Sequence, residues 1–194
     1  SSGIHKEISA IHESMRLILW LEHKMKQLAE KQTDERFDPP HSTLHVGQIQ
    51  GGVATNIVAD YTCFEWDVRS IPKDRISTIY NEFLAFCRER EREVRKLFPE
   101  FTISNTQLHP PVPALDTKET DSIVALTQKI SGHTTWETVS YAAEAGQFHE
   151  AGYQSIICGP GSIRQAHRAN EYTTQDQLDA CVGMLENLVA ELSE

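Results

Sequence analysis

A short polar segment near the carboxyl end carries the side chains best suited to chemistry. His167 lies there, four residues before Glu171. The apolar run 155–158 precedes it and predicts a buried strand, which Gly-Pro-Gly-Ser at 159–162 would end in a turn. Open α/β sheets bind ligands at the carboxyl edge of such strands. Because a neutral imidazole oriented by an acidic neighbour is a common metal ligand, this segment predicts a ligand or metal site.

Two features of this segment also have simpler explanations, which the residues alone leave open. A loop histidine such as His167 is more often a surface or helix-capping residue than a ligand. Gly-Pro-Gly is most often only a turn, since Pro fixes φ and Gly permits positive φ. Its position directly after a strand fits an anion-binding loop equally well.

Four elements in fixed order resemble the zinc-dependent amidohydrolases that include acetylornithine deacetylase, succinyl-diaminopimelate desuccinylase, aminoacylase and carboxypeptidase G2. Within that family the chain is most similar to the acetylornithine deacetylases. The four elements are Glu144-Ala145, Gly-Pro-Gly-Ser at 159–162, Ala166-His167 and Glu171-Tyr172.

This resemblance implies roles for four residues of the second half of the chain. It makes His167 a zinc ligand and places Gly161 and Ser162 near the substrate carboxylate. It implies that Glu144 contacts a substrate amine. The residues alone leave Glu144 an equal alternative, as a cap of the helix that follows it, because acidic side chains favour a first helical turn.

A second matching segment, GGVATNIVAD followed by DVR, lies within 51–69. It resembles the motif GGxAxNxVP…DxR in the lid of that family, with Ala59 in place of the proline. The resemblance implies that Arg69 clamps a substrate carboxylate and that Asn56 donates to a developing oxyanion. Two alternatives stay open, a salt bridge of Arg69 with Asp67 or Glu65 on the same strand face, and a turn role for Asn56.

The composition is that of an ordinary globular protein of 194 residues, 39% hydrophobic and 24% charged. The formal net charge of −10 argues against a nucleic-acid or anionic-membrane partner. No apolar run reaches the roughly 20 residues of a membrane span. The four cysteines are scattered without a disulfide-like spacing. We therefore expect a cytoplasmic protein with reduced thiols, no nucleic-acid partner and no membrane partner.

Apolar periodicity predicts the elements that position these residues. In the first part we expect, in chain order, a helix, two strands, a helix and a strand, at about 5–31, 43–50, 57–69, 74–97 and 101–108. A proline-rich hinge at 109–113 follows. Beyond it we expect helices around the strand at 155–158, at about 121–130, 142–151 and 174–192.

Two of the predicted helices carry a more specific expectation. The first helix has an apolar stripe at three- and four-residue spacing, formed by Ile4, Ile8, Ile11, Met15, Ile18, Met25 and Leu28. The second has a core stripe formed by Ile76, Ile79, Phe83, Phe86, Val94 and Leu97. Its alternating charged run at 89–93 predicts a solvated face with neighbouring ion pairs.

The element order predicts an α+β protein, mixed α/β in content, with two domains. Residues 1–112 are expected to form a lid and dimerisation domain of the ferredoxin-like βαββαβ type that lacks its first strand. Residues 113–194 are expected to be the C-terminal portion of an α/β metallohydrolase domain. We expect a homodimer through the lid, made by the first helix and the neighbouring edge strand.

The resemblance implies an enzyme that uses two zinc ions, or cobalt or manganese, to hydrolyse the amide of a small N-acyl amino acid such as N-acetylornithine. In the family a His-x-Asp pair, a bridging carboxylate, a Glu-Glu pair with the general base and a lid histidine precede the region that resembles this chain. Of the family's metal ligands this chain offers only His167, whereas a catalytic zinc needs about three protein ligands and a water. We therefore expect a fragment that is inactive alone, has no catalytic residue of its own and has its general base upstream of Ser1.

Two other functions fit the sequence. The first is a non-catalytic ferredoxin-like dimerisation or regulatory module, in which Asn56, Arg69 and His167 are structural residues and no metal binds. The second is a family relative with another substrate, a desuccinylase or a dipeptidase. Glu144-Ala145 favours the deacetylase branch, but one acidic residue does not fix the acyl group.

Overall fold

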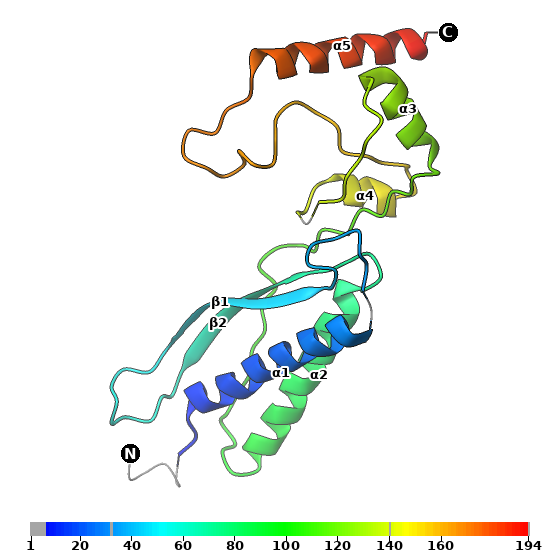
Figure 1. Cartoon of the computed structure of the whole chain (residues 1–194). Helices are drawn as coiled ribbons and strands as arrows, with labels where there is room; N and C mark the ends of the chain where they lie inside the picture. The colour runs from blue at the N-terminus through cyan, green and yellow to red at the C-terminus, as the bar shows by residue number, and fades with distance from the viewer. Residues whose placement is uncertain (1–6, 32, 140, 194) are drawn as a thin grey trace. The chain divides into compact units, whose positions relative to one another are not determined.

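A computed structural model describes residues 7–31, 33–139 and 141–193, and the chain divides into two compact units, 1–111 and 112–194. The first unit contains α1 (Ala10–Lys31), β1 (Thr43–Gly51), β2 (Thr62–Arg69) and α2 (Ile76–Arg95). The second contains α3 (Ser122–Ser131), α4 (Ala145–Glu150) and α5 (Gln175–Glu191) (Figure 1). The assignment of the two units to a lid and a catalytic portion stays a prediction.

The first unit is an α+β layer structure in which α1 and α2 lie on the same face of a two-stranded antiparallel sheet (Figure 1). The register runs from Thr43 opposite Arg69 to Gly51 opposite Thr62. Gly47 is an extra residue in β1, and this bulge keeps Ile49 opposite Phe64 on the helix-facing side.

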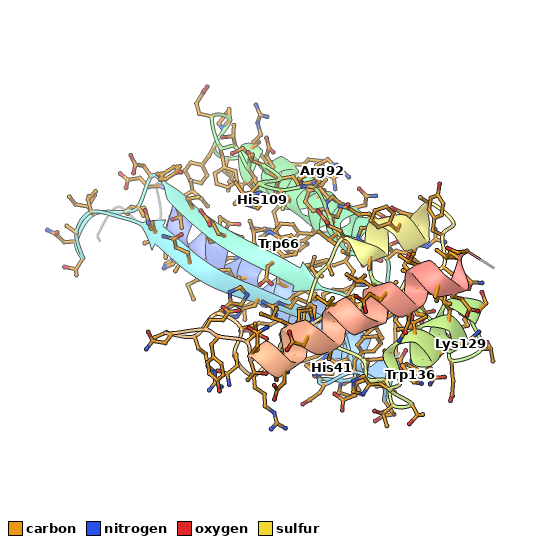
Figure 2. The ribbon with its side chains drawn as sticks, turned by 90° about the horizontal axis from the view of Figure 1, so that it is seen from above. His41, Trp66, Arg92, His109, Lys129 and Trp136 are labelled. Atoms are coloured by element: carbon orange, nitrogen blue, oxygen red, sulfur yellow. The ribbon has the colours of Figure 1, made fainter. Side chains whose placement is uncertain are left out.

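The core of this unit forms where both helices meet the sheet. Trp66 of β2, labelled in Figure 2, packs edge-on against Phe83 of α2 at 5.0 Å between ring centroids. Trp20 of α1 stacks on Phe86 at 5.9 Å. Aromatic pairs of this kind add about 0.5–1.5 kcal/mol each to the free energy of burial. The buried members of the cluster are Leu17, Leu21, Leu28, Leu44, Ile79, Phe83 and Cys87.

A buried ion pair joins α1 to α2 beside this core. Glu13 is a carboxylate, yet its residue is only 5% exposed. Arg90 donates to Glu13 Oε2 from Nε at 3.2 Å and from Nη2 at 2.8 Å, and Arg16 Nη1 lies 3.3 Å from Oε1. Two cations therefore compensate the one buried anion, as buried charges require.

Polar contacts fix the chain between α1 and the sheet. The hydroxyl of Ser42, a residue with no exposed surface, donates to Asp74 at 2.6 Å and accepts from the Ile71 amide at 3.0 Å. This node ties the start of β1 to the turn before α2. Nearby, Arg36 donates to both carboxylate oxygens of Asp34, and this hydrogen-bonded guanidinium lowers the pKa of Asp34 to about 2.

The described residues of the second unit form three helices with a very small core. Asn187 of α5 donates to the Ile130 carbonyl of α3 at 2.9 Å, and Lys129 donates to Glu191 at 2.7 Å. Thr174 begins α5 with a capping box shared with Gln177. Over the part of this unit that the structure describes, the buried apolar side chains are Val124 and Ile130 alone. No helix among the described residues is long and apolar enough to cross a bilayer.

Two predicted strands are wrong, because neither 101–108 nor 155–158 pairs with a neighbour among the described residues. Ile103 still packs against the core of the first unit. A strand forms only when its backbone groups find a ladder partner, and local periodicity does not supply one. The α+β class is therefore confirmed for the first unit, whereas the ferredoxin-like sheet and the α/β sheet of the second unit are not seen.

Several predicted boundaries also move. α1 starts at Ala10, where the His12 amide donates to Ser9 Oγ at 3.4 Å, rather than at residue 5. β2 starts at Thr62, because 52–61 form a loop in which the Ile57 amide donates to the Ala54 carbonyl at 3.2 Å. The helix predicted at 142–151 is shorter and spans Ala145–Glu150.

The predicted stripe of α1 is confirmed at Leu28 and in part at Met25, which is half-buried against the core, whereas it is wrong at Met15. Its members Ile8, Ile11 and Ile18 are half-buried. The buried positions are Glu13, Ser14, Leu17, Leu21 and Leu28, and Met15 is 52% exposed. Ile4 lies outside the described residues. When a helix is apolar on several sides, its sequence fits more than one choice of buried face. The layer that the helix packs against determines which face is buried. The stripe of α2 is largely confirmed, although Leu97 is 80% exposed and Cys87 is buried instead.

We expect Arg90→Ala to lower the free energy of unfolding by about 2 kcal/mol, because it leaves the Glu13 carboxylate buried with one peripheral cation. Urea denaturation followed by tryptophan fluorescence measures this loss. Arg92→Ala on the exposed face of the same helix is the matched control, with an expected change below about 0.5 kcal/mol. Equal effects of the two substitutions would show that the pair contributes nothing.

Candidate functional site

The six predicted site residues divide between the two units. Asn56 and Arg69 lie in the first, and the other four lie in the second. Their geometry is therefore given within each unit. The members in the second unit are Glu144, Gly161, Ser162 and His167.

Arg69 is the last residue of β2 and lies on the sheet face opposite the helices. Its Nε donates to Asp67 Oδ2 at 3.4 Å, and the two side chains are 71% and 54% exposed. The salt bridge that the sequence left open is therefore present, but exposed pairs of this kind contribute about 1 kcal/mol at most. A carboxylate ligand that bound Arg69 bidentately would replace a weak partner at little cost.

Asn56 lies in the loop between β1 and β2, in the turn closed by Ala54 and Ile57. Asn56 therefore occupies a turn, as one of the two alternatives from the sequence predicted. This loop follows Gly51, whereas Arg69 pairs with Thr43 at the other end of the strands. Seven residue steps of β2 at about 3.3 Å each separate the two ends by roughly 20 Å. The structure does not bring Asn56 and Arg69 together.

The turn at 159–162 is tied to the start of α5. Gly161 has φ of 105°, a conformation that favours glycine, and its carbonyl accepts from Gln177 Nε2 at 3.3 Å. Ser162 Oγ accepts from the Arg164 amide at 3.3 Å. Because Gln177 also belongs to the capping box of α5, the helix start holds the turn in place.

His167 has a left-handed backbone with φ of 60° and an exposed side chain. Its amide donates to Glu171 Oε2 at 3.1 Å. We expected the acidic neighbour to orient the imidazole, but Glu171 contacts the backbone amide of His167 instead. A positive φ is uncommon in a residue other than glycine, and the hydrogen bond to Glu171 stabilises this backbone conformation of His167.

Glu144 directly precedes α4 and makes no side-chain cap hydrogen bond to it. The capping role that the sequence left open is therefore not seen. Gly146, two residues later, lies so close to the carbonyl of Pro113 that a side chain there would collide with it. This contact holds the start of α4 against the segment that opens the second unit.

Over residues 7–31, 33–139 and 141–193, no three His, Cys, Asp or Glu side chains form a group that could hold a metal. A catalytic zinc needs about three protein ligands. His167 can supply one of them, so the described residues do not fit a complete zinc site.

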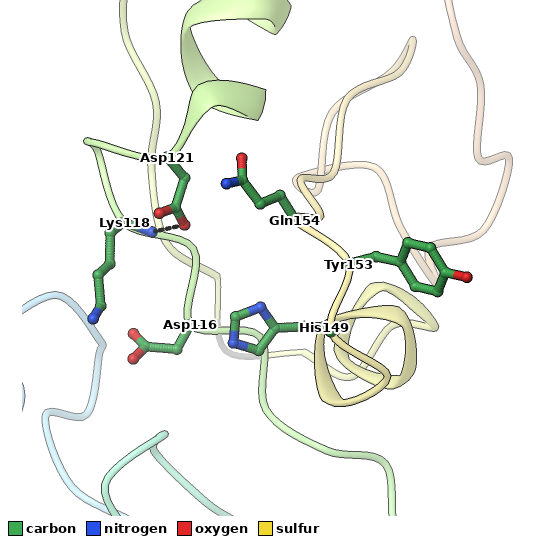
Figure 3. A pocket seen from close by; sticks show the side chains of 7 residues that line it. Asp116, Lys118, Asp121, His149, Tyr153 and Gln154 are labelled. Atoms are coloured by element: carbon green, nitrogen blue, oxygen red, sulfur yellow. Dashed lines mark hydrogen bonds between the residues drawn. The ribbon is translucent and has the colours of Figure 1, made fainter.

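Sequence reasoning missed a polar cavity of about 270 Å³ in the second unit (Figure 3). It is lined by Asp116, Lys118, Asp121, His149, Gly152, Tyr153 and Gln154. Gln154 Oε1 accepts from Ser122 Oγ at 2.7 Å and from the Ile123 amide at 3.1 Å, so it caps α3. The residues come from two distant segments and form no motif, although Asp-Ser before an apolar run signals the start of α3.

Comparison with known proteins gives a consistent result along the chain. Residues 1–95 match the family model of the M20 peptidase dimerisation domain. The chain is 30% identical over 182 residues to the acetylornithine deacetylase of Myxococcus xanthus, a match that covers 94% of this chain and 46% of that protein. It is 29% identical to the acetylornithine deacetylase of Pasteurella multocida, and this match covers 98% of this chain and 47% of that protein. The chain thus spans about half the length of these curated relatives.

We expect Gly161→Ala to open the loop that carries Ser162 and His167, since an alanine at φ of 105° is strained by about 1 kcal/mol. Trypsin cleavage after Arg164 and Arg168 should become about fivefold faster. Gly159→Ala is the matched control, because a Cβ there meets nothing within 4 Å. Equal cleavage rates in the two variants would contradict this expectation.

Proposed function

This chain belongs to the M20 peptidase family, whose dimerisation domain covers residues 1–95, and we propose that it is the lid and C-terminal part of a metal-dependent deacylase that hydrolyses an N-acyl amino acid. The observation that carries the proposal is the similarity to acetylornithine deacetylases over 94% and 98% of the chain. N-acetylornithine is therefore the first substrate to test.

Arg69 is the proposed clamp for the substrate carboxylate. Its weak exposed pair with Asp67 supports this role, because the guanidinium reaches a ligand without leaving a buried partner. Charge-assisted hydrogen bonds of a bidentate Arg contribute about 1.5–3 kcal/mol. Asn56 is the proposed amide donor to the carbonyl oxygen, which becomes negative as the amide is attacked.

A dimer reconciles these two roles with the length of the hairpin. Asn56 and Arg69 lie at opposite ends of the strands, roughly 20 Å apart, so one lid cannot present both to one small substrate. In a homodimer the lid of one subunit supplies Arg69 and the lid of the other supplies Asn56. The match of residues 1–95 to a dimerisation domain supports the dimer on which this arrangement depends.

The second unit is proposed to complete the contacts to the substrate. The turn at Gly161 and Ser162 would face the carboxylate with a backbone that the start of α5 holds in place. Glu144 would meet a substrate amine, and the absence of a cap hydrogen bond to α4 leaves its side chain available for that. His167 would bind one of two zinc ions, or of cobalt or manganese ions, in the whole protein.

The described residues do not fit a complete metal site, so no chemical step is assigned to this chain. We propose that the remaining metal ligands and the general base lie in a part of the whole protein outside this chain, and the 46% and 47% coverage of the two relatives leaves room for them. What this chain's residues do is bind and orient the substrate. Its net charge of −10 supports a small-molecule substrate over nucleic acid or a membrane surface, and we propose a cytoplasmic location.

A non-catalytic dimerisation module is the second candidate, favoured by the absence of a three-ligand group among the described residues. A desuccinylase or dipeptidase activity of the whole protein is the third, since Glu144 alone does not choose the acyl group. Metal content distinguishes the non-catalytic module from the deacylase. The ratio of kcat/KM on acetylated and succinylated substrates distinguishes the desuccinylase from the deacylase.

We expect the purified 194-residue chain to show no zinc-dependent hydrolysis of N-acetylornithine, because it supplies one ligand where about three are needed. The polypeptide encoded by the complete gene should hydrolyse this substrate and lose the activity with a chelator. Turnover by the 194-residue chain that a chelator abolishes would overturn the expectation.

The control for that experiment is His167→Ala in the complete polypeptide. It should lower the bound metal, measured by mass spectrometry of the ions, and reduce kcat by at least about 100-fold. An unchanged metal content would favour the non-catalytic module.

We expect the chain to be a homodimer at micromolar concentration, joined along α1 and the unpaired edge of β1. Leu19 of α1 is 47% exposed, so Leu19→Glu should weaken the dimer at least about tenfold in sedimentation equilibrium. Leu97→Glu is the control, since Leu97 is 80% exposed beyond the end of α2. A wild-type monomer at these concentrations would contradict the dimer.

A further inference from the structure

One face of α5 carries a continuous apolar stripe that the described residues leave exposed. Its members recur at alternating spacings of four and three residues, which keeps them on one side of the helix. Their exposed fractions run from 41% to 74%. They are Leu178, Val182, Leu185, Val189 and Leu192.

This stripe is distinct from the side of α5 that contacts the rest of its unit. Met184 contacts Cys158, Asn187 binds the Ile130 carbonyl, and Glu191 pairs with Lys129. At about 100° per residue these positions lie away from Leu185 on the helical wheel. α5 therefore uses one side for α3 and keeps a second, apolar side without cover.

The second unit also has too little core to be stable in this form. Its described residues bury two apolar side chains, Val124 and Ile130, and none of them belongs to α5. Each apolar side chain taken fully out of water contributes about 1.5–3 kcal/mol, so two cannot offset the entropy of ordering a unit of this size. Further burial is required, and the stripe of α5 is a continuous exposed apolar surface on which to build it.

The charges on α5 indicate what covers the stripe. Asp179 and Glu186 flank it on the side away from α3, and the helix contains no Lys or Arg. A second copy of α5 would bring like carboxylates together along the seam, which costs free energy. A partner helix with its own apolar stripe would cover the stripe of α5. Lys or Arg residues beside that stripe would pair with Asp179 and Glu186.

We propose that this stripe is the docking surface for an amphipathic, basic-flanked helix in the part of the metallohydrolase that lies outside the region matched here. The proposal rests on the proposed function. The length of the relatives supports it, because this chain covers 46% and 47% of two of them and leaves about as much polypeptide to supply the helix. Docking there would join the residues around His167 to the remaining metal ligands.

Hydrogen exchange followed by mass spectrometry tests this surface directly. The amides of α5 should exchange about 100-fold more slowly in the polypeptide encoded by the complete gene than in the 194-residue chain. Leu185→Glu in the complete polypeptide should return α5 to fast exchange. Ala180→Glu is the matched control, because Ala180 is exposed, lies outside the stripe and precedes the residues of α5 that contact Cys158 and α3, and it should leave the protection unchanged.

If Leu185→Glu fails to fold, Glu186→Lys gives a second measurement. It should reduce the protection of α5, and the reduction should shrink as salt screens the pair. Protection of α5 already present in the 194-residue chain would overturn the proposal, because the chain or its dimer would then be the cover. A complete gene that encodes no further helix would overturn it as well.

The metal content of the same samples separates this proposal from the proposed function. Metal bound through His167 in a protein whose α5 stays unprotected would overturn the docking surface alone. Protection of α5 with metal content that does not depend on His167 would overturn the metal role and leave the docking surface in place.

Discussion

The buried pair of Glu13 and Arg90 is the interaction on which the first unit depends. A carboxylate that is 5% exposed is stable only with its cation in place, so α1 and α2 are held in one alignment. The aromatic contacts of Trp20 and Trp66 then fill the layer between these helices and the sheet. Because the two helices pack as one layer, they hold the sheet in one orientation. Arg69 is exposed at the end of β2, so the position of its backbone is set by this packing.

Among its described residues, the second unit has no equivalent buried ion pair. Its helices are joined by polar contacts at their ends, such as Asn187 to Ile130, and by two buried apolar side chains. Local hydrogen bonds shape the turn at Gly161 and the backbone of His167, but they contribute about 1 kcal/mol each. Local hydrogen bonds thus set the loop conformations of this unit. Its stability requires apolar burial, which these residues supply only in small part.

The sequence could predict what depends on local pattern. The alternation of Phe64, Trp66 and Val68 identified β2, and periodicity identified the core of α2. It could not predict the strand pairing of 101–108 and 155–158, because a ladder needs a neighbour that no local pattern specifies. Arg90 shows the same limit. Within an alternating charged run it looked solvated, yet its partner lies 77 residues away.

The same limit applies to the candidate site. The motif could identify residue types, such as Gly161 at a turn and His167 in a polar loop, but it could not give the distance between Asn56 and Arg69. That distance is set by the length of β2, since eight paired residues separate the loop from the strand end. Under the proposed function, one hairpin cannot bring both residues to one small substrate, because they lie at opposite ends of its strands. Each end would therefore serve a different site of a dimer.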